Sequence, residues 1–336
     1  MLERKKLFNE LGDDSLQAQK IVGGSATGIL NLNNVKYSWV KPLFRKMLSD
    51  FWVPEKVSLV EDKVSIKNLT QEEDEAVRNT LSFLIFLDSI QVANLPNIAN
   101  YITDPAISNL IGVQDFQEII HTQSYQYILE GLYPNSERED IYNLWRDNPV
   151  LLERNKFIAE QYEQFIDSPT EHNFKRVLVA NFLLEGIYFY SGFNLFEQLA
   201  ARQKIVQTAK IISYIKVDEA NHLTVFTNII NDLMDTQKEA HWIIPMVEKA
   251  VQQEIAWGHY IYGDKILGIS KKSTEEHIKS LGNKRLRALR LPEVFGDIVN
   301  PYLHLELKDA NKRENFFETS VTTYSRSEAV DGWDEF

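Results

Sequence analysis

Apolar residues recur at intervals of three and four positions along most of the chain. This spacing collects apolar side chains on one face of an α-helix, so the pattern predicts an all-α protein with very little sheet. Residues 57–66 form a short stretch in which apolar and polar residues alternate instead. The expected helices lie within residues 37–50, 70–96, 113–131, 137–166, 169–193, 203–234, 241–267 and 273–289.

Local sequence signals mark several of these helix ends. Thr70 and Glu73 have the spacing of a capping box, in which each side chain binds a free backbone amide of the other residue. Ser168-Pro169 is a start signal for the long helix that follows it. Pro245 is expected either to kink its helix or to mark the start of that helix.

The two ends of the chain differ from its middle. Residues 1–34 include Gly23, Gly24 and Gly28 and have weak periodicity, so we expect an arm that lies over the surface. From about residue 308 the chain turns polar and loses its periodicity, as is typical of a flexible tail. The predicted organisation is therefore an arm (1–34), a helical domain (35–307) and a flexible C-terminal tail (308–336).

Composition restricts the chemistry that the chain can perform. It has 336 residues, of which 44% are hydrophobic, so it can bury a full core without covalent cross-links. It contains no cysteine, which excludes disulfides, thiolate zinc sites, iron-sulfur clusters and a cysteine nucleophile. Any metal chemistry must therefore use His, Asp and Glu.

Charge and hydropathy indicate which partners to expect. Lys and Arg total 36 against 48 Asp and Glu, a formal charge of -12 that argues against a nucleic acid partner. The N-terminus is charged, and the longest apolar stretch (residues 81–87) is far shorter than the ~20 residues that cross a bilayer. We therefore predict a cytoplasmic protein with neither a nucleic acid nor a membrane partner.

Two of the seven histidines follow a glutamate by three positions: His121 follows Glu118, and His222 follows Glu219. Residues three apart on a helix share one face, so each pair can offer an oxygen and an imidazole nitrogen to one ion. One such pair alone is typical of a solvent-exposed helix. Two pairs on separate long helices are the arrangement of ferritin-like carboxylate proteins, in which two further helices each add one carboxylate.

Asp88 and Glu185 are the candidates for those two carboxylates, because each lies inside an apolar segment of another long helix. Burying a lone carboxylate costs several kcal/mol, so a cation or a hydrogen-bond network normally lies beside it. Oxygen ligands with one imidazole per ion suit iron or manganese. The sequence thus predicts a ferritin-like helical bundle whose four-helix core holds two metal ions through Asp88, Glu118, His121, Glu185, Glu219 and His222; a polar network without metal is the alternative.

Tyr125 follows Glu118 by seven residues and therefore returns to nearly the same helix face, toward the metal pair. A dry pocket around it would protect a one-electron-oxidised phenol from quenching. Apolar candidates for this pocket on the neighbouring helices are Leu81, Phe189, Phe193 and Ile215.

These motifs together resemble those of a known family, the small, radical-generating subunit of class I ribonucleotide reductase. The resemblance rests on residues 88–91, 118–125, 185–189 and 218–224, in the family's order and at close to its intervals, and extends from residue 51 to the tail. It implies that one metal ion is held by Asp88, Glu118 and His121, and the other by Glu185, Glu219 and His222, with Glu118 and Glu219 able to bridge. Iron is the expected metal, with manganese or a mixed pair left open.

The resemblance also implies how the chain works. Tyr125 would carry a tyrosyl radical that forms when the reduced metal pair reacts with dioxygen. Trp52 would connect through Asp218 and His121 to the metal site, and Tyr324 in the tail would relay the radical to a large catalytic subunit. That subunit would dock on the tail and reduce ribonucleoside diphosphates with its own thiols, while this chain would form a homodimer.

Two other classes of protein share this ligand pattern. A related dimetal-carboxylate oxidase would act on a bound small molecule without a large subunit, but Asp88 and the Tyr324 segment count against it. A ferritin-like metal store would need neither Trp52 nor Tyr324. A helical scaffold without metal is the third alternative, which a metal analysis would separate.

Overall fold

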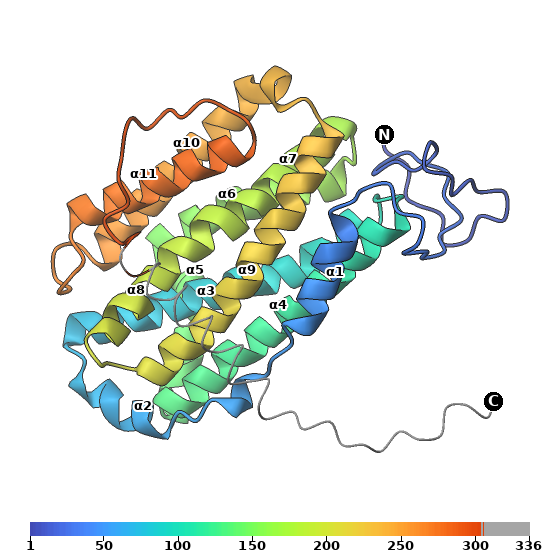
Figure 1. Cartoon of the computed structure of the whole chain (residues 1–336). Helices are drawn as coiled ribbons and strands as arrows, with labels where there is room; N and C mark the ends of the chain where they lie inside the picture. The colour runs from blue at the N-terminus through green and yellow to red at the C-terminus, as the bar shows by residue number, and fades with distance from the viewer. Residues whose placement is uncertain (304, 306–336) are drawn as a thin grey trace, which may run out of the picture. The chain divides into compact units, whose positions relative to one another are not determined.

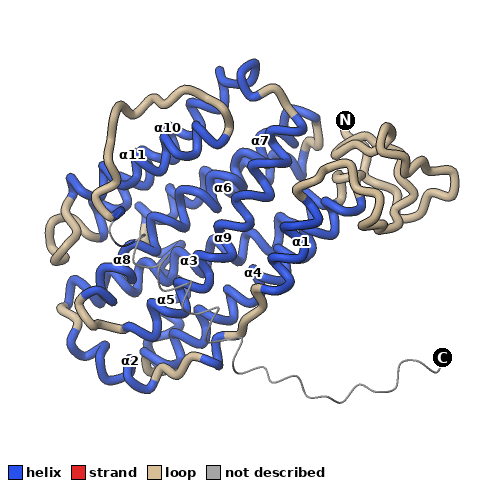
Figure 2. Tube along the Cα trace, viewed as in Figure 1, coloured by secondary structure: helices blue, strands red, loops and turns tan. Residues whose placement is uncertain are grey.

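The computed structural model describes residues 1–303 and 305. Helices account for its regular structure (Figure 2), and within these residues the only β-type pairing is an isolated bridge between Ile266 and Ile269. The prediction of an all-α protein is therefore confirmed. The described chain divides into two units, residues 1–298 and residues from 299 onward, and all the helices below belong to the first unit.

The helices follow one another along the chain in the order shown in Figure 1. Their bounds are α1 Val40–Ser49, η1 Pro54–Lys56, α2 Val60–Ser65, η2 Ile66–Asn68, α3 Gln71–Ala99, α4 Pro105–Leu132, α5 Asn135–Asp147, α6 Pro149–Asp167, α7 Glu171–Leu183, η3 Leu184–Tyr188, α8 Phe189–Ala201, α9 Val206–Leu233, α10 Thr236–Ile261 and α11 Lys271–Ala288. The alternating stretch over residues 57–66 folds mostly into α2 and the start of η2, not into a strand.

Four long segments form the centre of the bundle: α3, α4, α9 and the continuous run of α7, η3 and α8 (Figure 1). α3 packs on α4 and α8, while α9 packs on α4, α7 and α8. α10 and α11 pack on each other and also contact η3. The predicted four-helix core with additional helices around it is therefore present.

Capping explains where the long helices begin. The predicted capping box opens α3: the Thr70 hydroxyl accepts the backbone amide of Glu73 at 3.3 Å, and the Glu73 carboxylate accepts that of Thr70 at 2.9 Å. α4 begins earlier than the predicted residue 113, because the Asp104 side chain accepts two amides of its first turn and Pro105 occupies its first position. Pro245 neither begins nor ends its helix, because it lies inside α10.

The long segment made of α7, η3 and α8 is not a regular α-helix throughout, which the sequence did not predict. Between α7 and α8 the backbone widens into the π-helical turn η3, which carries Glu185. Arg285 of α11 donates from Nε to the carbonyl oxygen of Gly186 in this turn at 2.7 Å. A Cβ atom on Gly186 would lie 2.5 Å from that Nε atom, so the close approach requires glycine.

α3 is the one described helix whose length and composition would allow it to cross a membrane. Its most apolar window of 18 residues has a mean hydropathy of 1.3, and 56% of that window is buried within the protein. The helix also carries the fully buried Asp88. These features are typical of a core helix, so the hydropathy of α3 is weak evidence for a membrane span.

Candidate metal centre

The four core segments bring the six predicted ligands to one place. α3 supplies Asp88, and the π-helical turn η3 supplies Glu185. α4 and α9 each supply a glutamate and a histidine one helical turn apart, as the spacing of three residues predicts. All six side chains are completely buried: Asp88, Glu118, His121, Glu185, Glu219 and His222.

The six residues form two overlapping groups. In each group, one candidate ligand atom per residue lies within 4.8 Å of those of the other members. The first group consists of Asp88, Glu118, His121 and Glu219, and the second of Glu118, Glu185, Glu219 and His222. Glu118 and Glu219 belong to both groups, which is the geometry that a bridging carboxylate requires.

In both groups the histidine presents Nδ1 to the carboxylates. His121 Nδ1 lies 3.3 Å from Asp88 Oδ1, 3.2 Å from Glu118 Oε2 and 3.1 Å from Glu219 Oε1. His222 Nδ1 lies 3.1 Å from Glu118 Oε1, 2.9 Å from Glu219 Oε2 and 3.7 Å from Glu185 Oε2. Each imidazole therefore offers a nitrogen to the space that its carboxylates surround.

The donor set fits a pair of metal ions. Asp88 Oδ2 and Glu185 Oε2 are buried and accept no hydrogen bond from any described residue. Four carboxylates concentrated in a site without solvent need positive charge to balance them. Oxygen-rich ligands with one imidazole per position are suited to iron or manganese.

The electrostatics indicate what balances this charge in the absence of metal. Burial raises the pKa of Asp88 and of Glu185, and the neighbouring carboxylates raise it further. Burial acts to lower the pKa of His121 and His222, but the surrounding carboxylates outweigh it and raise both pKa values well above the usual range. The metal-free site therefore holds extra protons, which bound cations would displace.

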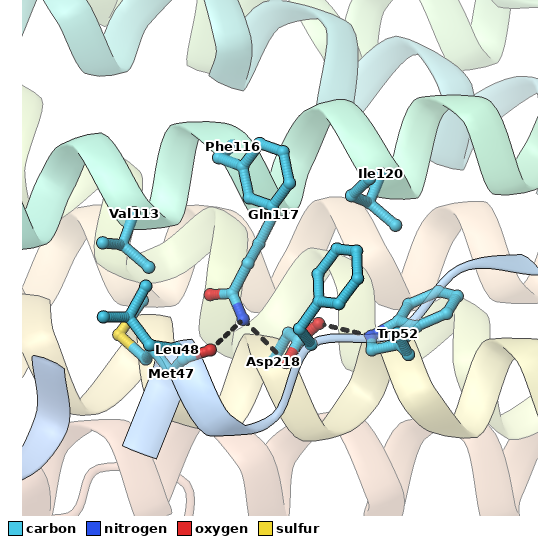
Figure 3. A pocket seen from close by; sticks show the side chains of 9 residues that line it. Met47, Leu48, Trp52, Val113, Phe116, Gln117, Ile120 and Asp218 are labelled. Atoms are coloured by element: carbon cyan, nitrogen blue, oxygen red, sulfur yellow. Dashed lines mark hydrogen bonds between the residues drawn. The ribbon is translucent and has the colours of Figure 1, made fainter. Parts of the chain in front are cut away.

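Trp52 and Asp218 extend the site outward from His121. Asp218 Oδ2 accepts a hydrogen bond from Trp52 Nε1 at 2.8 Å (Figure 3), and it lies 3.2 Å from His121 Nε2. The rings of Trp52 and His121 are stacked, with centroids 6.1 Å apart. The structure thus brings these three predicted residues together; Tyr324 lies outside the described residues.

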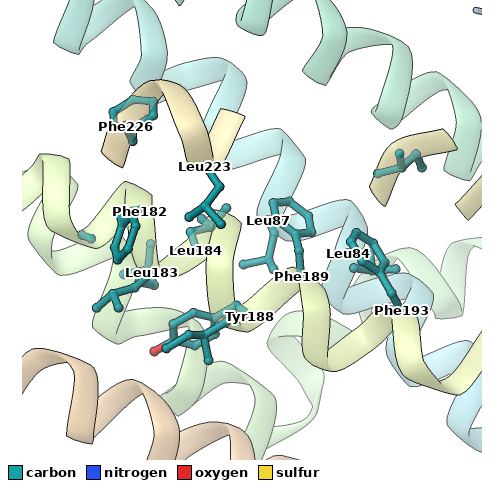
Figure 4. Packing of buried hydrophobic residues seen from close by; sticks show 14 of the residues in the cluster. Leu84, Leu87, Phe182, Leu183, Leu184, Tyr188, Phe189, Phe193, Leu223 and Phe226 are labelled. Atoms are coloured by element: carbon teal, nitrogen blue, oxygen red, sulfur yellow. The ribbon is translucent and has the colours of Figure 1, made fainter. Parts of the chain in front are cut away.

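Tyr125 is completely buried on α4, and its hydroxyl makes no hydrogen bond to a described residue. Burial raises the pKa of Tyr125 well above its usual value, and the charge of Asp88 adds to the effect. The four apolar candidates for its pocket are also completely buried, and Figure 4 shows two of them, Phe189 and Phe193, within the packed core. The phenol is therefore shielded from water and close enough to Asp88 to feel its charge.

Sequence reasoning missed a set of buried amides around the ligands. Gln114 Nε2 donates to Glu185 Oε1 at 2.8 Å, Asn181 Nδ2 donates to the same oxygen at 3.4 Å, and Gln91 Nε2 also donates to it. Gln117 bonds to both Asp218 and His222. A sequence signal existed, because Gln114 and Asn181 each lie four residues before a predicted glutamate ligand, on the same helix face.

Comparisons with known proteins agree with this geometry. The model of the family "Ribonucleotide reductase, small chain" matches residues 29–301. The ribonucleoside-diphosphate reductase subunit beta of Treponema pallidum (strain Nichols) is 39% identical over 341 residues, covering 98% of this chain and 97% of that protein. The ribonucleotide reductase R2 subunit from Clostridium botulinum has a TM-score of 0.88 at 41% identity, covering 92% of this chain and 99% of that one. Streptococcus sanguinis dimanganese(II)-NrdF, with a TM-score of 0.73 at 23% identity over 82% of this chain and 98% of that one, supports the fold alone.

Fold and site together define a dimetal-carboxylate protein of the ferritin-like type. The family match and the relatives then place it more closely: the chain belongs to the ribonucleotide reductase small-chain family. The resemblance inferred from the motifs is thereby confirmed. Membership implies a metal-dependent oxidoreductase subunit that forms a dimer and works with a large subunit.

Proposed function

We propose that this chain is the radical-generating small subunit of a class I ribonucleoside-diphosphate reductase. It would create a radical on Tyr125 and pass it to the large subunit, where ribonucleotides are reduced to deoxyribonucleotides. The observation that carries the proposal is the pair of overlapping ligand groups that share Glu118 and Glu219. Tyr125 lies on the helix that also supplies Glu118 and His121.

Asp88, Glu118 and His121 would hold one metal ion, and Glu185, Glu219 and His222 the other. A reduced metal pair held by these residues would supply the dioxygen chemistry that oxidises Tyr125 by one electron. Iron is our first choice, and manganese or a mixed pair uses the same ligand types. We place this reaction in the cytoplasm.

The residues around Tyr125 provide a proton acceptor for its phenol and shield it from water. When Tyr125 loses one electron, its O–H proton must also leave, because a phenol radical cation is a strong acid. Asp88 is suited to receive that proton, since its charge acts on Tyr125 and its Oδ2 atom accepts no hydrogen bond from a described residue. The burial of Tyr125 keeps water and reductants from the neutral radical.

The radical then needs a path to the large subunit. Trp52 is half-buried, and its hydrogen bond to Asp218 reaches the ligand His121, which supports a path from the metal site toward the surface. We propose that Tyr324 continues this path and that the C-terminal tail docks on the large subunit. Replacing Tyr324 with Phe should keep the Tyr125 radical but stop turnover with the large subunit; normal turnover would refute the relay.

The first experiment is electron paramagnetic resonance on metal-free protein that is loaded anaerobically with ferrous iron and then exposed to oxygen. A tyrosyl signal that is absent from the Tyr125→Phe variant, at equal metal content, would support the proposal. If iron yields no organic radical, the loading is repeated with manganese and a flavoprotein activator. A protein that binds two ions and forms no radical with either metal would contradict the assignment of Tyr125.

A further inference from the structure

Gln117 lies beside both halves of the metal centre, but no sequence motif singled it out. It is on α4, one residue before Glu118, and only 5% of it is exposed. Figure 3 shows its side-chain amide directed between the backbone carbonyl of Met47 and the carboxylate of Asp218. Its neighbours fix the roles of its two amide atoms.

The amide orientation follows from what those neighbours can do. The Met47 carbonyl and the Asp218 carboxylate only accept hydrogen bonds, so the amide nitrogen of Gln117 must face them. Nε2 donates to Met47 O at 3.4 Å and to Asp218 Oδ1 at 3.1 Å. The amide oxygen is left to face His222 Nε2, which lies 3.0 Å away.

This contact determines which nitrogen of His222 carries the proton. An amide oxygen can only accept, so His222 must donate from Nε2. In the neutral imidazole the lone pair is then on Nδ1, the atom that lies 2.9 Å from Glu219 Oε2 and 3.1 Å from Glu118 Oε1. A metal-binding histidine needs this arrangement, because its other nitrogen must donate to a fixed partner.

Asp218 has the corresponding role for the other histidine. Its Oδ2 atom lies 3.2 Å from His121 Nε2 and accepts from Trp52, while its Oδ1 atom accepts from Gln117. Both ligand histidines and Trp52 therefore belong to one hydrogen-bonded network, which runs from His222 through Gln117 and Asp218.

We propose that Gln117 is a positioning residue that orients His222 for metal binding and connects the second metal position to the Asp218–Trp52 path. The inference rests on the proposed function and extends it. Packing alone does not require a glutamine at this position. Gln117 lines a pocket of about 170 Å³ whose other walls include the apolar side chains of Met47, Val113 and Ile120. An apolar side chain would satisfy such walls, whereas only an amide donates to Asp218 while it accepts from His222.

The test is a titration of metal-free protein with Mn²⁺, in which electron paramagnetic resonance measures the free ion. Gln117→Met keeps the length of the side chain but removes the acceptor. Gln117→Glu keeps an oxygen that can accept from His222, and in its protonated form it also donates to Asp218 as the amide does. Gln123→Leu is the matched control, because Gln123 is an exposed residue of the same helix that donates only to Glu55 among the described residues.

We expect the wild-type chain and Gln123→Leu to bind two Mn²⁺ ions. In Gln117→Met, one ion should bind about ten- to a hundredfold more weakly while the other is unchanged, and Gln117→Glu should recover most of that loss. Unchanged binding in Gln117→Met, or equal losses in Gln117→Met and Gln117→Glu, including a failure of both to fold, would overturn the role of Gln117. A wild-type chain that binds no pair of ions would instead refute the proposed function.

Discussion

The two halves of the metal centre have similar ligands but differ in what surrounds them. On the Glu185 side, three buried amides converge on one carboxylate oxygen, and the ligand lies on the π-helical turn η3. On the Asp88 side, the carboxylate contacts His121, and its second oxygen accepts no hydrogen bond from a described residue. Among the described residues, only the Glu185 side is held by a network of amides, although Glu185 Oε2, like Asp88 Oδ2, accepts no hydrogen bond.

This difference indicates that the two halves have different roles: one holds a fixed carboxylate, and the other can exchange a proton. Amide donors fix the Glu185 carboxylate in place before metal arrives, since each donor bonds to the same oxygen. The uncommitted oxygen of Asp88 can exchange a proton with Tyr125, whose pKa responds to the charge of Asp88. His121, on the Asp88 side, contacts Asp218 directly, whereas His222 is connected to Asp218 only through Gln117. The proposed function thus assigns the radical chemistry to the Asp88 side, which has fewer hydrogen bonds to its carboxylate.

The largest effect should come from changing a carboxylate that both halves share. Glu118→Gln keeps the side-chain size but removes the charge from both ligand groups, so we expect the metal content to fall from two ions per chain to near zero. Glu185→Gln changes one group only and should lose one ion. Elemental analysis of the purified proteins measures this, with Glu130→Gln at an exposed position of α4 as the control. Equal losses in Glu118→Gln and Glu185→Gln would contradict the sharing of Glu118 between the two ligand groups.

Asp218→Asn should separate radical formation from radical transfer. Asn has one acceptor oxygen where Asp218 has two, so it cannot accept from Trp52, His121 and Gln117 together. We expect turnover with the large subunit to fall about ten- to a hundredfold, while the yield of the Tyr125 radical falls less. Radical yield and turnover are measured on the same preparation. A loss of both in equal proportion would assign Asp218 to metal binding alone.

The pH dependence of stability should differ between the metal-free and metal-loaded forms. The carboxylates raise the pKa of His121 and His222 despite their burial. A histidine with a raised pKa stabilises the fold below its unfolded pKa of about 6.5, and this stabilisation is lost as the pH rises through the folded value. The melting temperature of metal-free protein should therefore fall as the pH rises above about 6.5, and that of the metal-loaded form should fall less. Calorimetry measures the melting temperature across this pH range. Equal slopes of melting temperature against pH in the two forms would contradict a contribution from His121 and His222.

Much of the fold and most of the site could be predicted from local sequence patterns. Spacings of three and four residues predicted the helices, and the same spacing placed Glu118 with His121 and Glu219 with His222. These features depend on residues close together in the chain. Asp88 was found because a charge inside an apolar helix is costly unless it has a partner.

Features that depend on distant residues could not be predicted in this way. Gln117 acquires its role from Met47, Asp218 and His222, which come from other segments of the chain. The π-helical turn receives a hydrogen bond from Arg285, which is 99 residues from Gly186. The start of α4 is a different case, because Asp104 and Pro105 are a local signal that indicates it.

The smallest effect we predict tests whether the π-helical turn supports the Glu185 half specifically. In Gly186→Ala the new Cβ would lie 2.5 Å from Arg285 Nε and 2.9 Å from Leu223 Cδ1, so we expect a loss of about 1–3 kcal/mol in the free energy of unfolding. Gly112→Ala is the matched control in α4; nothing lies within 4 Å of its Cβ, and it should gain up to about 1 kcal/mol. Denaturant unfolding measures both free energies.

A Mn²⁺ titration tests the effect of the turn on the metal centre. Gly186→Ala should weaken the binding of one ion and leave that of the other unchanged, because the displaced turn carries Glu185 and not Asp88. If the binding of both ions weakened equally, the turn would support the bundle as a whole and not the Glu185 side in particular.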